Sequence, residues 1–355
     1  MSHSEVQGIA VNVSTVAAYL KQITHTMGVR FSQHMQVFRL SEGLSNLNYL
    51  IKDGEQAFVL RLNHKGSDGF VSREHELNCW QLAAQANLAP KILFVSEDRQ
   101  CYLSEFIVTD KLWSQQMTAS QSHADATQHK LCPDAEQRLA DLLLRLQSLP
   151  LPANHMDLTG QWQHYLQQLA LANDGLKASS PSSDTQDEQQ QRWCRRWHRL
   201  NEYEQVVRQA ISLSDSYLIG PQFCHRDLTP HNLLHADGRL FCIDFEYACA
   251  SHPLFDLAVI LQTHNLTCMQ QQRLCDIYFA QQSNLKPNAA KALTGISSLY
   301  WFYSAAWALL MAAQSLAAEN KPVTQALTPY QANDYFTWFD DYLEKAIDIS
   351  SSDQK

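Results

Sequence analysis

The chain has little of what nucleic-acid-binding and secreted proteins usually carry. Its 355 residues include 27 Lys and Arg against 36 Asp and Glu, a formal net charge of −9, and no basic patch dominates. This balance argues against nucleic acid as a partner. None of the nine cysteines forms a Cys-x-x-Cys pair and their total is odd, which favours a reducing cytoplasm over a disulfide framework. Residues 1–11 have neither a basic region nor an apolar core, so we expect no signal peptide.

Charged residues are also missing from residues 292–318, which are long enough to span a bilayer. Polar residues such as Thr294, Ser297 and Gln314 interrupt this stretch, so we expect a buried core helix and no membrane insertion. Apolar residues make up 45% of the chain, which excludes a disordered protein. The length exceeds that of a typical single core and no internal repeat is present, so we expect two lobes.

A dense polar motif lies between Phe223 and Glu246. Asp227 and Asn232 fit the spacing His-Arg-Asp-x-x-x-x-Asn, and Asp244 follows an apolar run that predicts a strand. Phosphoryl transfer requires this set: one carboxylate orients the acceptor hydroxyl, while an amide and a second carboxylate hold metal. Each residue alone has an ordinary explanation as a turn or cap residue. Together, at this spacing, they predict a phosphotransferase.

The same motif argues against a protein kinase. Glu246 stands where the Asp-Phe-Gly motif of protein kinases has glycine, and no Ala-Pro-Glu segment follows. Asp256 comes only 12 positions after Asp244, which leaves little room for a peptide-docking loop. We therefore expect a small-molecule acceptor.

The N-terminal third predicts a nucleotide-binding sheet. Residues 35–40, 49–51 and 57–62 alternate as short strands do. The intervening loop has the composition of a tight turn whose N–H groups bind phosphate, although an ordinary hairpin is at least as consistent with its single glycine. The phosphate-binding candidates in this loop are Gly43, Ser45, Asn46 and Asn48.

Arg61 lies on the last of these strands, on the opposite face from Phe58 and Leu60. A guanidinium there would bind the nucleotide phosphates with a planar fork; the alternative is an edge-strand surface residue. Residues 71–87 predict a helix that Pro90 ends. Either Glu74 or Glu76 on this helix would pair with Arg61, and Glu76 is the preferred candidate.

These residues resemble the superfamily of choline kinases, thiamine kinases and aminoglycoside phosphotransferases, and Ile243–Ala248 is most similar to the choline and thiamine kinase branch. The resemblance implies an α+β, protein-kinase-like fold of two lobes. A small antiparallel-sheet lobe would occupy residues 1–106 and a larger, mainly helical lobe residues 107–355, with a flexible loop at 177–190.

The resemblance also implies roles for individual residues. Asp227 would be the catalytic base or acceptor-positioning group, and Asn232 and Asp244 would hold Mg²⁺. Asp256 would tie down the backbone of the catalytic loop. Residues 102–107, including Glu105 and Ile107, would lead into the hinge that binds the adenine of ATP.

The acceptor is predicted from an aromatic run in the helical lobe. Tyr300, Tyr303 and Trp307 share one helical face with Trp301 beside it, and Glu246 would add a negative charge. Aromatic faces attract cations such as choline, ethanolamine or thiamine, yet an aromatic stripe on a helix more often belongs to a core. An aminoglycoside phosphotransferase with an acidic rim and a nucleotide-binding pseudokinase remain alternatives, and the oligomeric state is open. The acidic residues in question are Asp334, Asp340 and Asp341.

Overall fold

A computed structural model describes residues 13–28, 30–40, 46–63, 72–109, 112–117, 132–178, 184–318 and 330–352. The chain forms two compact units. The first unit contains Met1–Pro152, Asp227–Ala248 and Thr263–Ile277, and the second contains Ala153–Arg226, Cys249–Gln262 and Tyr278–Lys355. The bounds of these compact units differ from those of the two expected lobes, 1–106 and 107–355. The two lobes stay a prediction.

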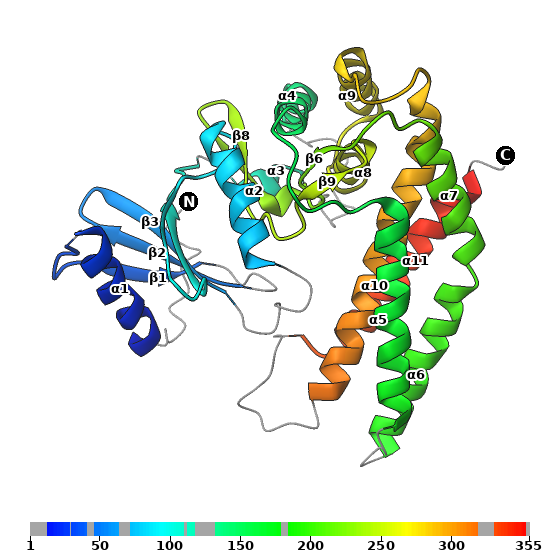
Figure 1. Ribbon diagram of the computed structural model, residues 1–355, viewed down its shortest axis with the longest axis horizontal. Coiled ribbons are helices and arrows are strands. Elements are labelled where there is room, and N and C mark those ends of the chain that lie inside the picture. The colour runs from blue at the N-terminus through cyan, green and yellow to red at the C-terminus, as the bar shows by residue number, and fades with distance from the viewer. Residues whose placement is uncertain are drawn as a thin grey trace, which may run out of the picture. The chain divides into compact units, whose positions relative to one another are not determined.

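The first unit is built on a five-stranded antiparallel sheet (Figure 1). A two-residue turn at Gly54 and Glu55 joins the second and third strands, and Gly54 has the positive φ of 61° that such turns require. The helix α1 (Val13–Met27) packs Val16, Leu20 and Ile23 against the sheet. In spatial order the strands are β1 (Gln36–Arg39), β2 (Asn46–Asp53), β3 (Gln56–Asn63), β5 (Cys101–Glu105) and β4 (Ile92–Val95).

The three predicted N-terminal strands are confirmed, with ends shifted by a few residues. Arg61 is on β3, the central strand of the sheet, where it lies opposite Asn48 on one side and Tyr102 on the other. Its side chain is buried. The alternative interpretation of Arg61 as an edge-strand surface residue is therefore wrong.

The predicted helix at 71–87 is α2 (Arg73–Gln85). The Ser72 hydroxyl caps it by accepting the N–H of His75, and Asn87, with a positive φ of 55°, follows its C-terminal end. The face that packs inward contains Glu76, Cys79 and Trp80. A buried carboxylate on this face signals a partner within the first unit.

The catalytic segment supplies the rest of the architecture around α2. The strands β7 (Leu233–Ala236) and β8 (Arg239–Cys242) pair as a hairpin through Asp237 and Gly238, both at positive φ. A short 3₁₀ turn, η2 (Pro230–Asn232), precedes them. The remaining helices here are α3 (Trp113–Met117), α4 (Ala135–Gln147) and α9 (Cys268–Gln281), the last of which ends in the second unit.

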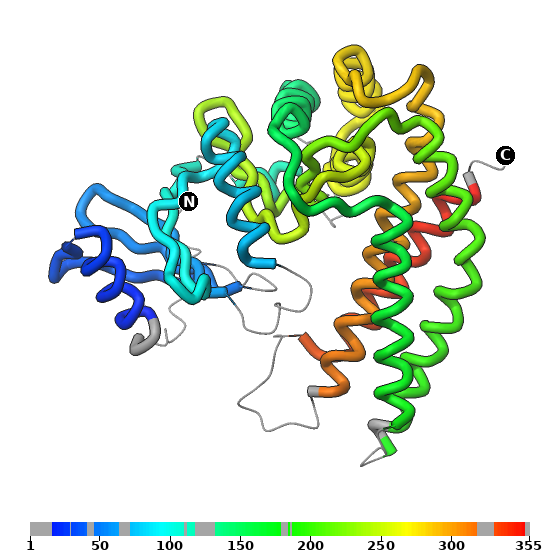
Figure 2. The backbone as a smooth tube through the Cα atoms, in the orientation of Figure 1, coloured from blue at the N-terminus to red at the C-terminus, as the bar shows by residue number. Residues whose placement is uncertain are grey.

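The second unit is a helical bundle around α10 (Leu293–Ala318), which contacts α5, α6, α7 and α11 (Figure 2). Residues 289–317 form the one helix in the described part of the chain that is long and apolar enough to cross a membrane, and 78% of its apolar window is buried inside the structure. The expected core helix is thus observed. Its neighbours are α5 (Leu158–Ala178), α6 (Asp184–Asn201), α7 (Glu204–Ser216) and α11 (Ala332–Ser352).

Two short strands and one further helix complete the second unit. The strands β6 (Gln222–Cys224) and β9 (Cys249–Ser251) pair antiparallel, and α8 (Leu254–Thr263) follows β9.

The predicted flexible loop at 177–190 is wrong at both ends, because α5 runs to Ala178 and α6 begins at Asp184. The Gln-rich start of α6, which includes Glu188, has good helix formers that a polarity argument overlooks. Residues 179–183 lie outside the described residues.

Candidate active site

The backbone that leads into the catalytic loop is held by one buried carboxylate. Asp256, in the first turn of α8, accepts the backbone N–H groups of His225 and Arg226, both at 2.8 Å. Burial raises the pKa of Asp256 to about 6, against the opposing effect of those two hydrogen bonds and of the Arg226 guanidinium. This is the contact that the resemblance implied for Asp256.

The two polar residues of the loop are bonded to each other. The Asn232 side-chain N–H₂ donates to the Asp227 carboxylate at 2.6 Å and to the Asp227 backbone oxygen at 3.0 Å. The Asn232 amide therefore directs its nitrogen at Asp227, which leaves its oxygen as the acceptor or ligand atom. Ile243 N–H donates to the Asn232 backbone oxygen at 3.0 Å. The loop is thus tied to the residue that precedes Asp244.

Arg61 and Glu76 form a buried ion pair, with 2.6 Å between Nη2 and Oε1. The same carboxylate accepts from Arg73 Nη1 at 2.8 Å, and all three side chains are at most 7% exposed. Glu74 instead pairs with Arg99 at the surface. The structure thus favours Glu76 as the partner of Arg61, as preferred from the sequence.

Arg61 also faces the metal-binding candidate. Its Nη1 lies 3.4 Å from Asp244 Oδ1, and its Nε donates to Asn63 Oδ1 at 3.0 Å. Burial alone would lower the pKa of Arg61, but the carboxylates of Glu76 and Asp244, with that of Glu246, hold it above its ordinary value. The guanidinium is a permanent cation, fixed between two carboxylates.

The catalytic segment is bonded directly to α2 and to the chain that follows it. His75 Nε2 lies 2.7 Å from Ala248 O, and Cys242 N–H donates to Leu88 O at 2.8 Å. These bonds lie on both sides of Asp244. They fix the position of Asp244 relative to the helix that carries Glu76.

Glu246 is the third carboxyl group beside Arg61. Its Oε2 is buried without a hydrogen-bond partner among the described residues. Burial, followed by the negative charge of Asp244, raises the pKa of Glu246 to about 8, although Arg61 opposes the shift. The raised pKa favours the neutral carboxylic acid over the negative charge that was expected of Glu246 in the acceptor site.

The other predicted nucleotide residues are only partly brought together. Asn48 lies opposite Arg61 in the β2–β3 ladder, and Asn46, at the start of β2, is buried. Glu105 ends β5 and accepts the Lys91 N–H at 3.2 Å, with Ile107 half-buried two residues later. Gly43 and Ser45 lie outside the described residues. The roles of these residues in nucleotide binding stay predictions.

Three of the predicted acceptor aromatics lie near one another, because Tyr300 contacts Trp301 at 4.7 Å between centroids and Phe255 packs on both Tyr300 and Tyr303. The Tyr303 side chain is 2% exposed, and its hydroxyl donates to Leu158 O at 2.7 Å, as a core residue does. Trp301 already has a cation over its ring, because Lys345 Nζ lies 4.6 Å from the centroid. Tyr300 packs edge-on against Phe255. None of these three shares a ring contact with Trp307 among those described.

Trp307 belongs to a cluster of four aromatic side chains that the sequence analysis missed. Its ring is nearly parallel to that of Trp338, at 12° and 6.3 Å between centroids. The Tyr335 ring stands at 78° to Trp307 and 90° to Trp338, so it forms a perpendicular wall. Tyr330 adds a fourth ring, 5.0 Å from Trp338. The i, i+3 spacing of Tyr335 and Trp338 on α11 was the signal available in the sequence. We call Trp307, Tyr330, Tyr335 and Trp338 the aromatic cluster.

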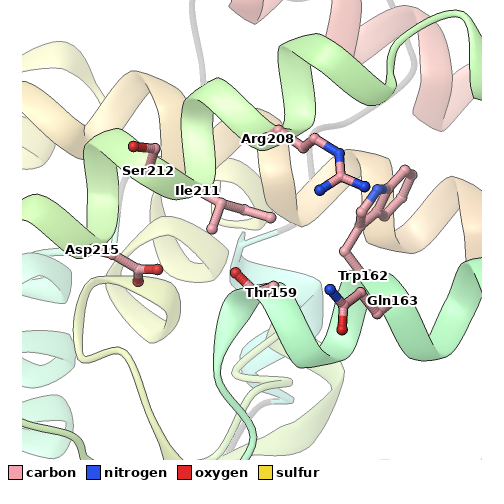
Figure 3. Close-up of a pocket in the computed structure, with 7 residues that line it drawn as sticks. All are labelled: Thr159, Trp162, Gln163, Arg208, Ile211, Ser212 and Asp215. Carbon is pink, nitrogen blue, oxygen red and sulfur yellow. The ribbon is translucent and has the colours of Figure 1, made fainter.

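The second unit also has an open hollow of about 330 Å³ between α5 and α7 (Figure 3). Trp162 and Ile211, both buried, form its floor, and Arg208 and Asp215 stand on its rim. The Asp215 pKa is raised by burial and by the nearby Asp157 carboxylate. No residue of this hollow was predicted as functional, and it contains none of the predicted reactive groups.

The donor set of the first unit fits Mg²⁺. Asn232 offers an amide oxygen and Asp244 a carboxylate that is 29% exposed, and oxygen donors are the ligands that Mg²⁺ prefers. The described residues contain no group of three or more His, Cys, Asp and Glu side chains that would hold a metal ion by themselves. This fits an ion that is bound through one or two protein groups together with substrate phosphates.

Comparison with known proteins also indicates a phosphotransferase. The chain is 24% identical over 250 residues to the protein LicA of Haemophilus influenzae, a match that covers 70% of this chain and 64% of that relative. The match thus spans a little under two thirds of the relative's length.

Solved structures establish the fold. The choline kinase LicA of Streptococcus pneumoniae is 14% identical with a TM-score of 0.61, and the match covers 96% of this chain and 99% of that one. A spectinomycin phosphotransferase, solved with ADP and spectinomycin, is 13% identical with a TM-score of 0.57, covering 97% and 99%. The predicted α+β, kinase-like fold is therefore confirmed. The model of the phosphotransferase enzyme family matches residues 37–293, and the chain belongs to this family.

Proposed function

We propose that this protein transfers the γ-phosphate of ATP, with Mg²⁺, to the hydroxyl group of a small cationic metabolite of the choline, ethanolamine or thiamine type. The observation that carries the proposal is the connected polar set of the first unit. Asp227 is bonded to Asn232, and Arg61 bridges Asp244 and Glu76. Family membership supports the reaction class, and the aromatic cluster supports a cationic acceptor.

Each residue of the set has a distinct task in this reaction. Asp227 accepts a hydrogen bond from the acceptor hydroxyl and orients it for in-line attack on the γ-phosphate. The amide of Asn232 donates to Asp227 and holds that carboxylate in place. Arg61 neutralises phosphate charge while Glu76 fixes its guanidinium. Mg²⁺, held by Asn232 and Asp244, would neutralise charge on the phosphates as the transfer proceeds.

Positioning and electrostatics supply the rate in such a site. The groups that meet charge in the transition state are held in advance by buried partners, so they do not need to reorganise when the phosphoryl group moves. Arg61 is an example, because Asn63 and Glu76 fix the guanidinium from two sides.

The acceptor class is inferred from the aromatic cluster. Two nearly parallel indoles and a perpendicular phenol offer several ring faces, and Trp307, Tyr330 and Trp338 are each partly exposed. A cation gains most within about 6 Å of a ring centroid. The 6.3 Å between the two indoles leaves no room for a methylated ammonium between them, so we expect the cation at the partly exposed rim.

The aminoglycoside alternative loses its main support. It required an acidic rim, but Asp340 pairs with Arg196 at 2.5 Å and Asp341 with Lys345 at 2.7 Å. Asp340 and Asp341 are thus paired with cations of the second unit, whereas Asp334 accepts the Gln331 N–H at 2.9 Å. A polycationic antibiotic would have to displace the protein's own cations.

The test is Mg²⁺-dependent release of ADP from ATP against choline, ethanolamine, thiamine and aminoglycosides, with Asp227→Ala as the inactive control. We expect one small cation to stimulate release by the wild type and not by the variant. Stimulation only by aminoglycosides would contradict the acceptor class. Absence of ATP binding would contradict the reaction class.

A second experiment addresses the aromatic cluster if choline is the acceptor. Trp338→Leu should raise the KM for choline by roughly 10-fold, as loss of a cation–π contact predicts, with the KM for ATP unchanged. Trp197→Leu is the matched control, since Trp197 is a half-buried, stacked tryptophan on α6 outside the cluster. Dimethylbutanol, the uncharged carbon isostere of choline, should have a higher KM than choline in the wild type. In the Trp338 variant this difference in KM should disappear. An equal effect of both variants would argue against the cluster as the cation site.

A further inference from the structure

Arg226, the residue before Asp227, adopts a backbone conformation that its side chain does not favour. Its φ is +72°, in the left-handed region, where a Cβ crowds the backbone. Among the described non-glycine residues with positive φ, five are Asn or Asp, and only Arg99 and Arg226 are neither. Backbone strain of this kind persists only where surrounding contacts enforce it.

The contacts that enforce it are made by the Arg226 side chain as well as its backbone. The guanidinium donates to Ser251 Oγ at 2.6 Å and to Gln161 Oε1, so both of its terminal nitrogens are bonded. Its plane lies over the Phe255 ring, 3.6 Å from the centroid. Three elements of the second unit thus hold one side chain: α5, β9 and α8.

The supports themselves are rigid. Ser251 donates its hydroxyl to Met156 O at 2.6 Å, which orients its lone pairs toward Arg226. Phe255 stacks on Tyr303 at 17° and 6.0 Å, and Tyr303 stacks on Trp162 at 22° and 6.0 Å. All three rings are at most 3% exposed. The guanidinium therefore rests on a buried aromatic stack in the helical bundle.

We propose that Arg226 is a positioning residue for catalysis, an inference that rests on the proposed function. Its bonded guanidinium acts as a strut that keeps the backbone at positive φ, and this backbone conformation sets the direction of the next residue, Asp227. Asp256 holds the N–H of Arg226, but that contact alone leaves the torsions beyond the N–H free to rotate. The side chain removes this freedom.

The variant Arg226→Gly distinguishes a role of the Arg226 side chain from a role of the backbone conformation alone. Glycine adopts positive φ without strain, so Arg226→Gly keeps the conformation available while removing the strut. If only the backbone conformation mattered, this variant would match the wild type. If the strut matters, Asp227 samples other directions, and a misplacement of about 1 Å costs on the order of 10²-fold in rate.

The experiment measures kcat and KM for ATP in the transfer reaction, with choline as the probe acceptor, together with Tm. For Arg226→Gly we expect kcat to fall by about 10²-fold with the KM for ATP nearly unchanged. Tm should fall as well, because Ser251 and Gln161 lose a buried donor, so kcat is measured at a temperature where the variant is fully folded. Added guanidinium ion should restore part of the lost kcat, because the vacated site has the same two acceptors and the same ring. Arg226→Lys should also lose kcat, since one nitrogen does not reach both Gln161 and Ser251 in the planar geometry of a fork.

Arg99→Gly is the matched control. It relieves the same kind of positive φ at a half-exposed arginine whose side chain pairs only with Glu74 among the described ion pairs, and the variant keeps the backbone oxygen that accepts from Asn63. We expect its kcat to equal that of the wild type. A kcat for Arg226→Gly within about twofold of the wild type, or an equal loss in Arg99→Gly, would overturn the proposal. A wild type that transfers phosphate to no acceptor would overturn the proposed function and this inference with it, and that outcome is distinct from the variant result.

Discussion

At the scale of single residues, the shared carboxylate of Glu76 is the most constrained group in the first unit. It is fully buried between the guanidinium groups of Arg61 and Arg73. Breaking a buried ion pair by removing one partner costs more than the pair contributes, because the remaining charge stays buried. Here two cations would be left behind, so Glu76 affects both stability and the position of Arg61.

We expect Glu76→Gln to lower the free energy of unfolding by about 3 kcal/mol, the cost of leaving buried charge unpaired, and to lower kcat/KM for ATP by at least roughly 10-fold through the loosened Arg61. Chemical denaturation and steady-state kinetics measure the two effects. Glu74→Gln is the control, because its surface pair with Arg99 contributes about 0.5 kcal/mol or less. Equal effects of both variants would contradict the assignment of Glu76.

The proposed reactive residues could be selected from the sequence because a spacing rule covers them. The six positions from Asp227 to Asn232 allow one short loop, and Asp244 follows a strand that any such site needs. The aromatic cluster has no such rule. Tyr335 and Trp338 meet Trp307 only because α11 packs against α10, and no spacing along the chain records that contact.

At the scale of elements, the start of α8 depends on a neutral histidine. His252 Nδ1 accepts the N–H of Leu254 at 3.2 Å, so its Nε2 carries the proton and donates to Ser214 O at 3.0 Å. The side chain is 2% exposed. Burial lowers the pKa of His252 to about 4, and the nearby Arg226 cation adds to this. Protonation would also place a cation at a helix N-terminus, where the dipole opposes it.

The sign of the pH dependence follows from this depressed pKa. The stability that neutral His252 contributes is fully present above pH 6.5 and is lost as pH falls toward about 4. Full protonation would cost up to about 3 kcal/mol. We expect unfolding free energies measured between pH 7 and 4 to fall less steeply for His252→Gln, which cannot take up the proton, than for the wild type. Identical slopes would show that His252 does not control acid stability.

Elements with a clear period were predicted, and those specified by tertiary packing were not. The strand β3 has the alternation, and the helix α2 the apolar face and the following Pro90, that identify them from sequence. The helix α6 carries Arg192, Arg196 and Arg199, and their partners cannot be identified from the spacing of these arginines. In the structure these side chains reach α11 through Asn333, Asp340 and Glu344. Such long-range pairs depend on how α6 and α11 pack, and helix propensity does not record them.

At the scale of the whole molecule, the two compact units separate the predicted functions. Arg61, Glu76, Asp227, Asn232 and Asp244 all belong to the first unit, and the four residues of the aromatic cluster belong to the second. The catalytic segment 227–248 joins the first unit although it follows long helices of the second. A division of the chain at one residue does not describe such an arrangement, which is why the expected boundary between residues 106 and 107 differs from the compact units.

This separation predicts which parts of the molecule each ligand protects from hydrogen exchange. Mg²⁺–ADP should slow exchange in β3, α2 and β8 of the first unit, because a ligand at about 100-fold its Kd stabilises the bound state by about 2.7 kcal/mol. Choline should slow exchange in α10 and in the start of α11, which carry Trp307, Tyr335 and Trp338. Asp244→Asn is the control. In this variant the protection from hydrogen exchange by nucleotide should no longer depend on Mg²⁺, and the protection by choline should be unchanged. If nucleotide protects α10 and α11 and choline does not, the aromatic cluster is not the acceptor site. That outcome would not contradict the proposed phosphotransfer by the residues of the first unit.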